Sequence, residues 1–386
     1  MPGAPAHPNL ASLAARGSRT IEQKLSIQYL RGVAAILVVI YHATVTAAPD
    51  RTFSHGIFGV DIFFVISGFI MWAITAAAPT TPAAFLRQRI VRIVPLYWAL
   101  TLVAAFVAFR PDFRLDFNID YEWLLHSLFF IASASGEFEV KEMAAFPILP
   151  VGWTLNFEMM FYALFTVALF LRPAMRLAAI VGALTILVLT GAFVYDAAGP
   201  VLQFYTGSIS IEFAFGVLLG WAFMRCRSRG VSWNAPVSGA VLIAAAWLIY
   251  RYDLRLLDAR GIGAGLPALA VCAGALMMEP WLSKRPVRMF KLLGDASYSI
   301  YLSHLSALTI GAKLFSSIPF SFPQAVKIAL LIVIAVMAGV TVYKLIEQPV
   351  TARLRRALNV RSRAEALGKL PLRPADSRVT SSGKPE

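Results

Sequence analysis

IFGVDIFFVISGFIMWAITAA, residues 57–77, is an apolar stretch in which Asp61 is the only charged side chain. A helix needs about 20 such residues to cross the hydrocarbon core of a bilayer. The whole chain has the same character, because 58% of its 386 residues are hydrophobic and only 15% are charged, against roughly 25% charged residues in an average soluble domain. We therefore expect an all-α polytopic membrane protein.

Other apolar runs of similar length are spread along the chain, each close to the roughly 20 residues that a membrane span requires. The stretch 121–132 is too short to span and is expected to lie at the membrane interface. We predict about ten transmembrane helices, near residues 27–48, 57–77, 93–109, 153–171, 177–195, 208–224, 235–250, 262–280, 296–315 and 324–346.

Lysine and arginine predict the orientation. With the N-terminus inside, the cytoplasmic segments hold 24 of these residues and the outer segments 9, as the positive-inside rule requires. We therefore predict cytoplasmic termini in a bacterial inner membrane, with a disordered tail over 1–24, a transmembrane domain over 25–348 and a basic tail over 349–386. The net charge of +14 is explained by these loops and does not indicate nucleic-acid binding.

Charged groups inside membrane spans are costly and usually mark a site of function. Arg31 and His42 are eleven residues apart, which places them on one helix face about 16 Å apart along the axis. Asp61 should lie at the depth of His42, and a carboxylate beside an imidazole is a common general-base arrangement. The alternative is a buried ion pair that only fixes helix register. We predict His42 and Asp61 as the catalytic residues.

Four further positions are candidates. Arg89 and Arg92 lie three apart on one helix face, where they either anchor the helix at the membrane boundary or bind phosphate, which guanidinium groups suit. Glu158 lies five residues inside a span, where no boundary role requires a carboxylate. Tyr298 enters a late span through GDASYSIYLSH (294–304).

His304 ends that motif, and it either takes part in the chemistry or makes a packing hydrogen bond. No short cluster of metal ligands is present. We predict no metal site.

Five motifs, in order, resemble the membrane acyltransferase 3 family, and in particular its exopolysaccharide-modifying branch. They are Arg31 and His42 with ten residues between them, GVDIFFVISGF, the Arg89/Arg92 pair, WTLNFEMMFY and LGDASYSIYLSH. The resemblance covers nearly all of residues 25–348. It implies transfer of an acyl group, usually acetyl, from cytoplasmic acyl-CoA to a hydroxyl of an extracytoplasmic or lipid-linked polysaccharide, with His42 as the essential histidine and Arg31 as its motif partner.

From these residues we expect Arg31, Arg89 and Arg92 to bind the acyl-CoA donor. Glu158, Tyr298 and His304 are expected to bind the acceptor or to support the catalytic residues. Acyl-CoA is expected as a substrate, with no permanently bound cofactor, and the polysaccharide-synthesis machinery is a possible partner. His42 either deprotonates the acceptor hydroxyl or carries the acyl group itself. The rival interpretations are a glycan transporter or flippase without acyl-transfer chemistry, and a non-catalytic assembly subunit.

Overall fold

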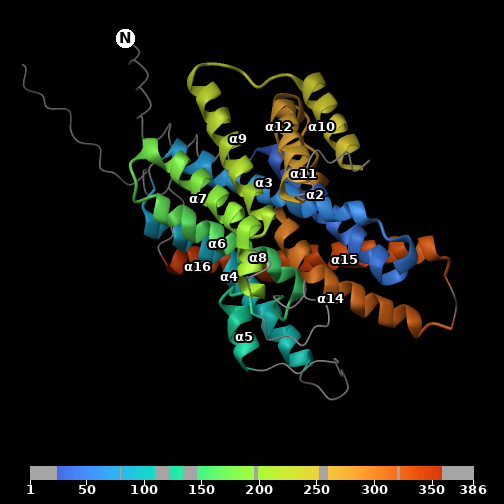
Figure 1. Cartoon of the computed structure of the whole chain (residues 1–386). Coiled ribbons are helices and arrows are strands. Elements are labelled where there is room, and N and C mark those ends of the chain that lie inside the picture. The colour runs from blue at the N-terminus through green and yellow to red at the C-terminus, as the bar shows by residue number, and fades with distance from the viewer. Residues whose placement is uncertain are drawn as a thin grey trace, which may run out of the picture.

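The computed structural model describes residues 24–78, 80–108, 121–133, 146–194, 199–251, 260–319 and 322–358, and over these residues every regular element is a helix. Figure 1 shows the arrangement. The helices are α2 (Leu25–Ala47), α3 (Phe58–Ala77), α4 (Pro82–Ala108), α5 (Tyr121–Leu128), α6 (Trp153–Ala168), α7 (Pro173–Val194), α8 (Pro200–Tyr205), α9 (Ile211–Ser228), α10 (Pro236–Arg251), α11 (Arg260–Gly263), α12 (Gly265–Leu282), α13 (Arg288–Asp295), α14 (Ser297–Ser316), α15 (Gln324–Val342) and α16 (Gln348–Ala357).

Each predicted span overlaps a helix, and within the described ranges the expectation of an all-helical, multi-pass membrane protein is confirmed. In the described part of the chain, seven helical segments are long and apolar enough to cross a membrane. The other three predicted spans correspond to α6 and α10, which have 16 residues each, and to α14, which has 20 residues but includes several serines, a histidine and a lysine. The count of ten and the side of each terminus stay predictions.

Helical structure continues past the last predicted span into the basic tail predicted from residue 349. A π-helix, Tyr343–Glu347, follows α15 and leads directly into α16. The extra residue in a π-turn redirects the side chains that follow it, and such turns are frequent at functional sites. The first residues of the predicted tail are therefore helical, while residues 359–386 and 1–23 lie outside the described residues.

Helix α3, the segment that indicated a membrane protein, is also the most buried of the seven apolar segments. It contacts α2, α9 and α12, so its apolar side chains face other helices. Glycine allows the closest of these contacts, because a Cβ on Gly68 would meet the carbonyl oxygen of Phe213, and one on Gly216 would meet that of Val65. Such small-residue packing lets membrane helices approach closely.

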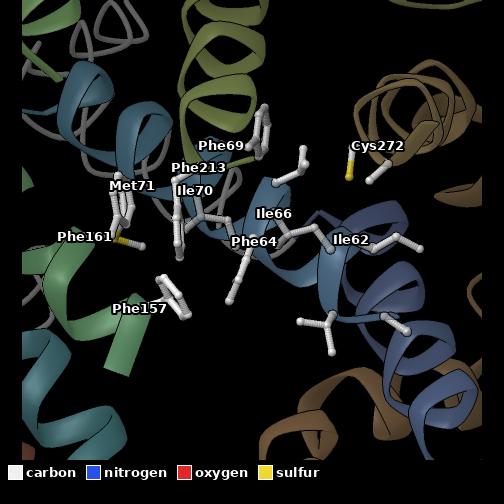
Figure 2. Packing of buried hydrophobic residues seen from close by; sticks show 14 of the residues in the cluster. Ile62, Phe64, Ile66, Phe69, Ile70, Met71, Phe157, Phe161, Phe213 and Cys272 are labelled. Carbon is white, nitrogen blue, oxygen red and sulfur yellow. The ribbon is translucent and has the colours of Figure 1, made fainter. Parts of the chain in front are cut away.

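Aromatic rings fill the space between α3, α6 and α9. The ring centroids of Phe64 and Phe213 lie 4.5 Å apart, as do those of Phe161 and Phe213. Figure 2 shows these side chains between the three helices, with Phe157 close by. Stacked aromatic pairs hold their helices in a fixed register. The packing therefore gives α3 a rigid position against which the neighbouring helices present polar groups.

Candidate active site

A cavity between α2, α3, α4, α6 and α14 brings the three predicted donor-binding arginines together. Arg31, Arg89 and Arg92 all line it, although they come from two helices, and we call it the arginine cavity. Its volume is about 90 Å³, against about 10–15 Å³ for one water molecule. The cavity thus has room for a slender chain but not for a whole nucleotide.

The arginines differ in exposure. Arg31 and Arg89 are buried, with 8% and 4% of their surface exposed, and Arg92 is half-buried. The Arg89 guanidinium also lies over the Phe85 ring, 6.0 Å from its centroid. Three guanidinium groups at one cavity suit an anionic group such as phosphate, because their planar N–H forks match its oxygen atoms. Simple anchoring at a membrane boundary does not require their burial.

Two residues that we expected to bind the acceptor or to support the catalytic residues share this cavity with the arginines. Glu158 accepts hydrogen bonds from the Tyr162 hydroxyl and, at 3.3 Å, from Ser67 Oγ. Tyr298 also lines the cavity, and its hydroxyl donates to the Ile93 carbonyl oxygen over 2.7 Å. The structure therefore places Glu158 and Tyr298 beside the three arginines, and their expected role toward the acceptor or the catalytic residues stays a prediction.

The catalytic candidate His42 lies against His304, 262 positions later in the chain. His42 Nδ1 is 3.2 Å from His304 Nε2, and the ring centroids are 4.8 Å apart. His42 is half-buried and His304 is fully buried. Among the residues that the structure describes, no group of three His, Cys, Asp or Glu side chains could hold a metal ion. The two imidazoles thus form a pair.

The backbone fixes which nitrogen atoms of the pair carry protons. His304 Nδ1 is 2.6 Å from the Tyr301 carbonyl oxygen. Since a carbonyl only accepts, Nδ1 is the donor, and Nε2 of the neutral ring is an acceptor. His42 Nδ1 faces that acceptor and also the Val38 carbonyl oxygen at 3.0 Å. We therefore assign its proton to Nδ1, which leaves the lone pair of His42 Nε2 free to act as a base or a nucleophile.

The histidine pair follows directly after the end of the arginine cavity. Tyr298, Tyr301 and His304 are spaced three apart on α14, so each lies about 4.5 Å further along the axis. The two tyrosines line the cavity. The Tyr301 hydroxyl is held by Thr154 Oγ1 at 2.9 Å and donates to the Val151 carbonyl at 3.2 Å, and its ring lies 5.9 Å from that of His304. Arginines, cavity and histidines thus follow one another along the bundle.

We expect His304→Ala to lower kcat for acyl transfer by roughly 10- to 1,000-fold, because His42 would lose one of the two acceptors of its Nδ1 proton and the imidazole that orients its ring. The corresponding change in a serine-protease triad costs about 10⁴-fold. His304→Gln should restore part of the rate, since its amide oxygen can accept the same proton. The measurement is kcat at saturating donor, together with the ¹⁵N shifts of His42. Wild-type kcat in His304→Ala would contradict a positioning role.

The expected contact between Asp61 and His42 is replaced by a different one. Asp61 Oδ1 lies 3.5 Å from Nη2 of Arg260, and Asp61 is 1% exposed. Glu212, on α9, is fully buried and interacts with both of these residues. Asp61 and His42 were expected to be at the same depth, but depth along an axis does not fix the direction of a side chain around it. Asp61 is therefore part of a buried cluster with Arg260 and Glu212.

Glu347 was not predicted and lies near the arginine cavity. Ser299 Oγ donates to Glu347 Oε2 over 2.5 Å, and the carboxylate is within electrostatic range of Arg31 and Arg92. Glu347 ends the π-helix, whose extra residue determines where this side chain points. The sequence shows only a glutamate at the end of an apolar run, so the available signal was its position beside a predicted span, where a carboxylate is unexpected.

Comparisons with known proteins identify the family of the chain. The acyltransferase domain of the acyltransferase 3 family matches residues 24–344. The exopolysaccharide production protein ExoZ of Rhizobium meliloti (strain 1021) is 34% identical over 320 residues, covering 80% of this chain and 94% of that protein. The putative membrane-bound transacylase BcsY of Komagataeibacter xylinus is 26% identical over 362 residues, covering 87% of each chain.

A putative O-acetyltransferase of Staphylococcus aureus (strain MRSA252) is 23% identical over 365 residues, which are 86% of this chain and 58% of that protein. No solved structure matches the chain. The family match covers most of the chain and includes the arginine cavity and both histidines. The chain belongs to the acyltransferase 3 family of membrane acyltransferases.

Proposed function

We propose that this protein transfers an acyl group, most simply acetyl, from acyl-CoA to a hydroxyl of an extracytoplasmic or lipid-linked polysaccharide. The observation that carries the proposal is the order of groups along the bundle: three arginines, a narrow cavity and a histidine with a free Nε2 lone pair. The names of two relatives, an exopolysaccharide production protein and a putative O-acetyltransferase, support the polysaccharide acceptor and the acetyl group.

In this proposal the phosphates of the donor bind at Arg31, Arg89 and Arg92, and its slender pantetheine arm extends along the cavity. The excess of lysine and arginine at this end of the helices supports a cytoplasmic mouth in the bacterial inner membrane. The nucleotide, which is too large for the cavity, stays at the mouth. The thioester then reaches the end of the cavity at Tyr301, close to the histidine pair.

The chemistry follows from the free lone pair of His42. The acceptor hydroxyl gives its proton to His42 Nε2, and its oxygen attacks the thioester carbonyl carbon. The carbon–sulfur bond breaks, the ester forms, and the proton returns to sulfur, so that coenzyme A leaves as the thiol. The same nitrogen could instead attack the thioester first and carry the acyl group to the acceptor. Both routes need His42 in the tautomer that His304 supports.

The proposal is tested with purified protein, ¹⁴C-labelled acetyl-CoA and exopolysaccharide from the producing strain. Label that appears in base-labile ester linkage on the polysaccharide, together with release of free coenzyme A thiol, supports it. If the folded protein transfers no acetyl group but moves the glycan across vesicle membranes, the result would instead support the transporter alternative.

We expect Arg92→Ala to weaken acyl-CoA binding by roughly 10- to 100-fold, because a hydrogen bond to a charged group is worth about 1.5–3 kcal/mol. Arg92→Lys should restore binding only in part, since a lysine lacks the planar fork. The measurement is the dissociation constant of acyl-CoA for protein in detergent, read by calorimetry.

Arg87→Ala is the matched control for this change. Arg87 lies on the same helix and carries the same charge, but it is exposed and donates to the Leu358 carbonyl oxygen away from the cavity. Its loss should leave the dissociation constant within about twofold. If Arg87→Ala and Arg92→Ala raised the dissociation constant of acyl-CoA equally, the arginines would act only through general electrostatic attraction or as membrane anchors.

A further inference from the structure

A second pocket lies at the end of the bundle opposite the start of α2. It is formed where the short 3₁₀-helix Ser54–Ile57, the end of α10 and α11 meet. Its volume is about 390 Å³, which is within the range of about 300–1,000 Å³ for small-molecule sites. Polar and apolar groups both line it, chiefly Ser54, His55, Ile57, Ile249, Tyr250 and Arg260. It shares no lining residue with the arginine cavity.

Arg260 forms the fixed part of the pocket. Behind it lie Asp61, 3.5 Å away, and Glu212, both essentially inaccessible to solvent. Its own side chain remains 42% exposed and lines the pocket. An arginine has five N–H donors in a rigid fork, so the ion pair with Asp61 leaves donors for a ligand. The buried Asp61 carboxylate thus holds the guanidinium group at the pocket wall, with Glu212 within electrostatic range of both.

The other polar groups are suited to hydroxyls. His55 Nε2 is 3.1 Å from the Arg251 carbonyl oxygen and therefore donates to it, which leaves Nδ1 as an acceptor. Tyr250 stacks on Phe58 at a centroid distance of 4.1 Å and packs edge-on against His55, so its ring has a fixed orientation. A tyrosine presents an apolar body and a polar tip. Such mixed surfaces fit sugars, which combine hydroxyls with C–H faces.

The pocket is next to the part of α2 that carries His42. Gly56, in the 3₁₀-helix of the pocket, packs so tightly on α2 that an added Cβ would meet the Leu37 carbonyl oxygen and would lie 2.8 Å from Tyr41 Cβ. His42 is the next residue along α2. The pocket and His42 are therefore at the same level of the bundle, and both are distant along α2 from Arg31 at the arginine cavity.

We propose that this pocket binds a sugar unit of the acceptor polysaccharide, with Arg260, His55 and Tyr250 as the residues that recognise it. The inference rests on the proposed function and supplies what that function lacks. Glu158 and Tyr298 line the arginine cavity and not this pocket, which offers the acceptor a separate set of partners. A polysaccharide held here would lie at the level of His42 along the bundle.

The test fills the pocket without removing any charge. Ser54 is exposed and lines the pocket, so Ser54→Trp should occupy its space, while Ser54→Ala is the matched control. We expect Ser54→Trp to raise KM for oligosaccharides from the strain's exopolysaccharide at least tenfold. The dissociation constant of acyl-CoA should not change, which also shows that the variant is folded. His55→Ala should raise the same KM by a smaller factor.

A second measurement separates this inference from the proposed function. Binding of the same oligosaccharides to the protein is measured without acyl-CoA, by saturation-transfer NMR. Binding to wild type and Ser54→Ala that is lost in Ser54→Trp supports the pocket even if no acyl transfer is found. If oligosaccharide binding and KM are unchanged in both Ser54→Trp and His55→Ala, the proposed sugar pocket is wrong, whatever the outcome for acyl transfer.

Discussion

His42→Ala should abolish measurable acylation of the polysaccharide while the protein still folds and binds its donor. General-base catalysis contributes roughly 10²–10⁴-fold in rate, and His42 Nε2 is the free basic nitrogen of the histidine pair. His42→Gln should fail as well, because the amide keeps size and polarity but cannot take a proton. Ester formation from labelled acetyl-CoA measures the rate, and calorimetry with acyl-CoA measures donor binding.

The matched control is His126→Gln, which removes an imidazole from α5, a helix that carries no residue of the arginine cavity or the histidine pair. Its acylation rate should stay near that of wild type. Transfer at nearly the wild-type rate by His42→Gln would exclude both catalytic routes and leave His42 as a packing residue.

Incubation of wild-type protein with labelled acyl-CoA and no acceptor distinguishes the two routes. Label retained on a peptide that contains His42 indicates an acyl-enzyme, in which the imidazole is the nucleophile. Absence of that label from protein that transfers normally once acceptor is added indicates direct attack by the hydroxyl. Rapid quenching at low pH is needed, because an acyl-imidazole hydrolyses readily.

The sequence predicted the meeting of the three arginines better than the surroundings of Asp61 and His304, for a physical reason. Arg31, Arg89 and Arg92 each lie near the same end of a predicted helix, so membrane topology alone brings them to a similar depth, and the structure places them at one cavity. Depth is the quantity that hydropathy and charge determine. The depths predicted from the sequence also correctly placed His42 about three helical turns from Arg31.

What the sequence could not supply was the direction of each side chain around its helix axis. The pairing of His42 with His304 depends on how α2 and α14 are rotated against each other. The rotation of α3 about its own axis turns Asp61 toward Arg260 on α11. Arg260 itself was counted only as a loop charge in the orientation argument, and Glu347 depends on a π-turn that no periodicity reveals. Tertiary packing sets these directions.

Asp61→Ala should destabilise the folded protein much more than it slows the chemical step. Removing one partner of a fully buried charge pair costs about 3–5 kcal/mol, because the remaining charge loses its compensation, and this is an upper bound here because the Arg260 side chain is 42% exposed. Here Arg260 would keep only Glu212 as a buried counter-charge. We expect a large fall in the unfolding temperature in detergent, with kcat per folded molecule reduced less than tenfold. The unfolding temperature of Asp61→Asn should lie between those of Asp61→Ala and the wild type.

Asp295→Ala is the control for this prediction, since Asp295 pairs with Lys291 at 2.6 Å in a position where both side chains are partly exposed. An exposed ion pair contributes only about 0–1 kcal/mol, so the unfolding temperature should hardly change. The opposite result for Asp61→Ala, with full stability and kcat lowered by 10²-fold or more, would return Asp61 to the catalytic role that its sequence position suggested. The loss of stability in Asp61→Ala, compared with its loss of kcat, therefore decides whether this carboxylate acts on His42 or holds Arg260 at its pocket.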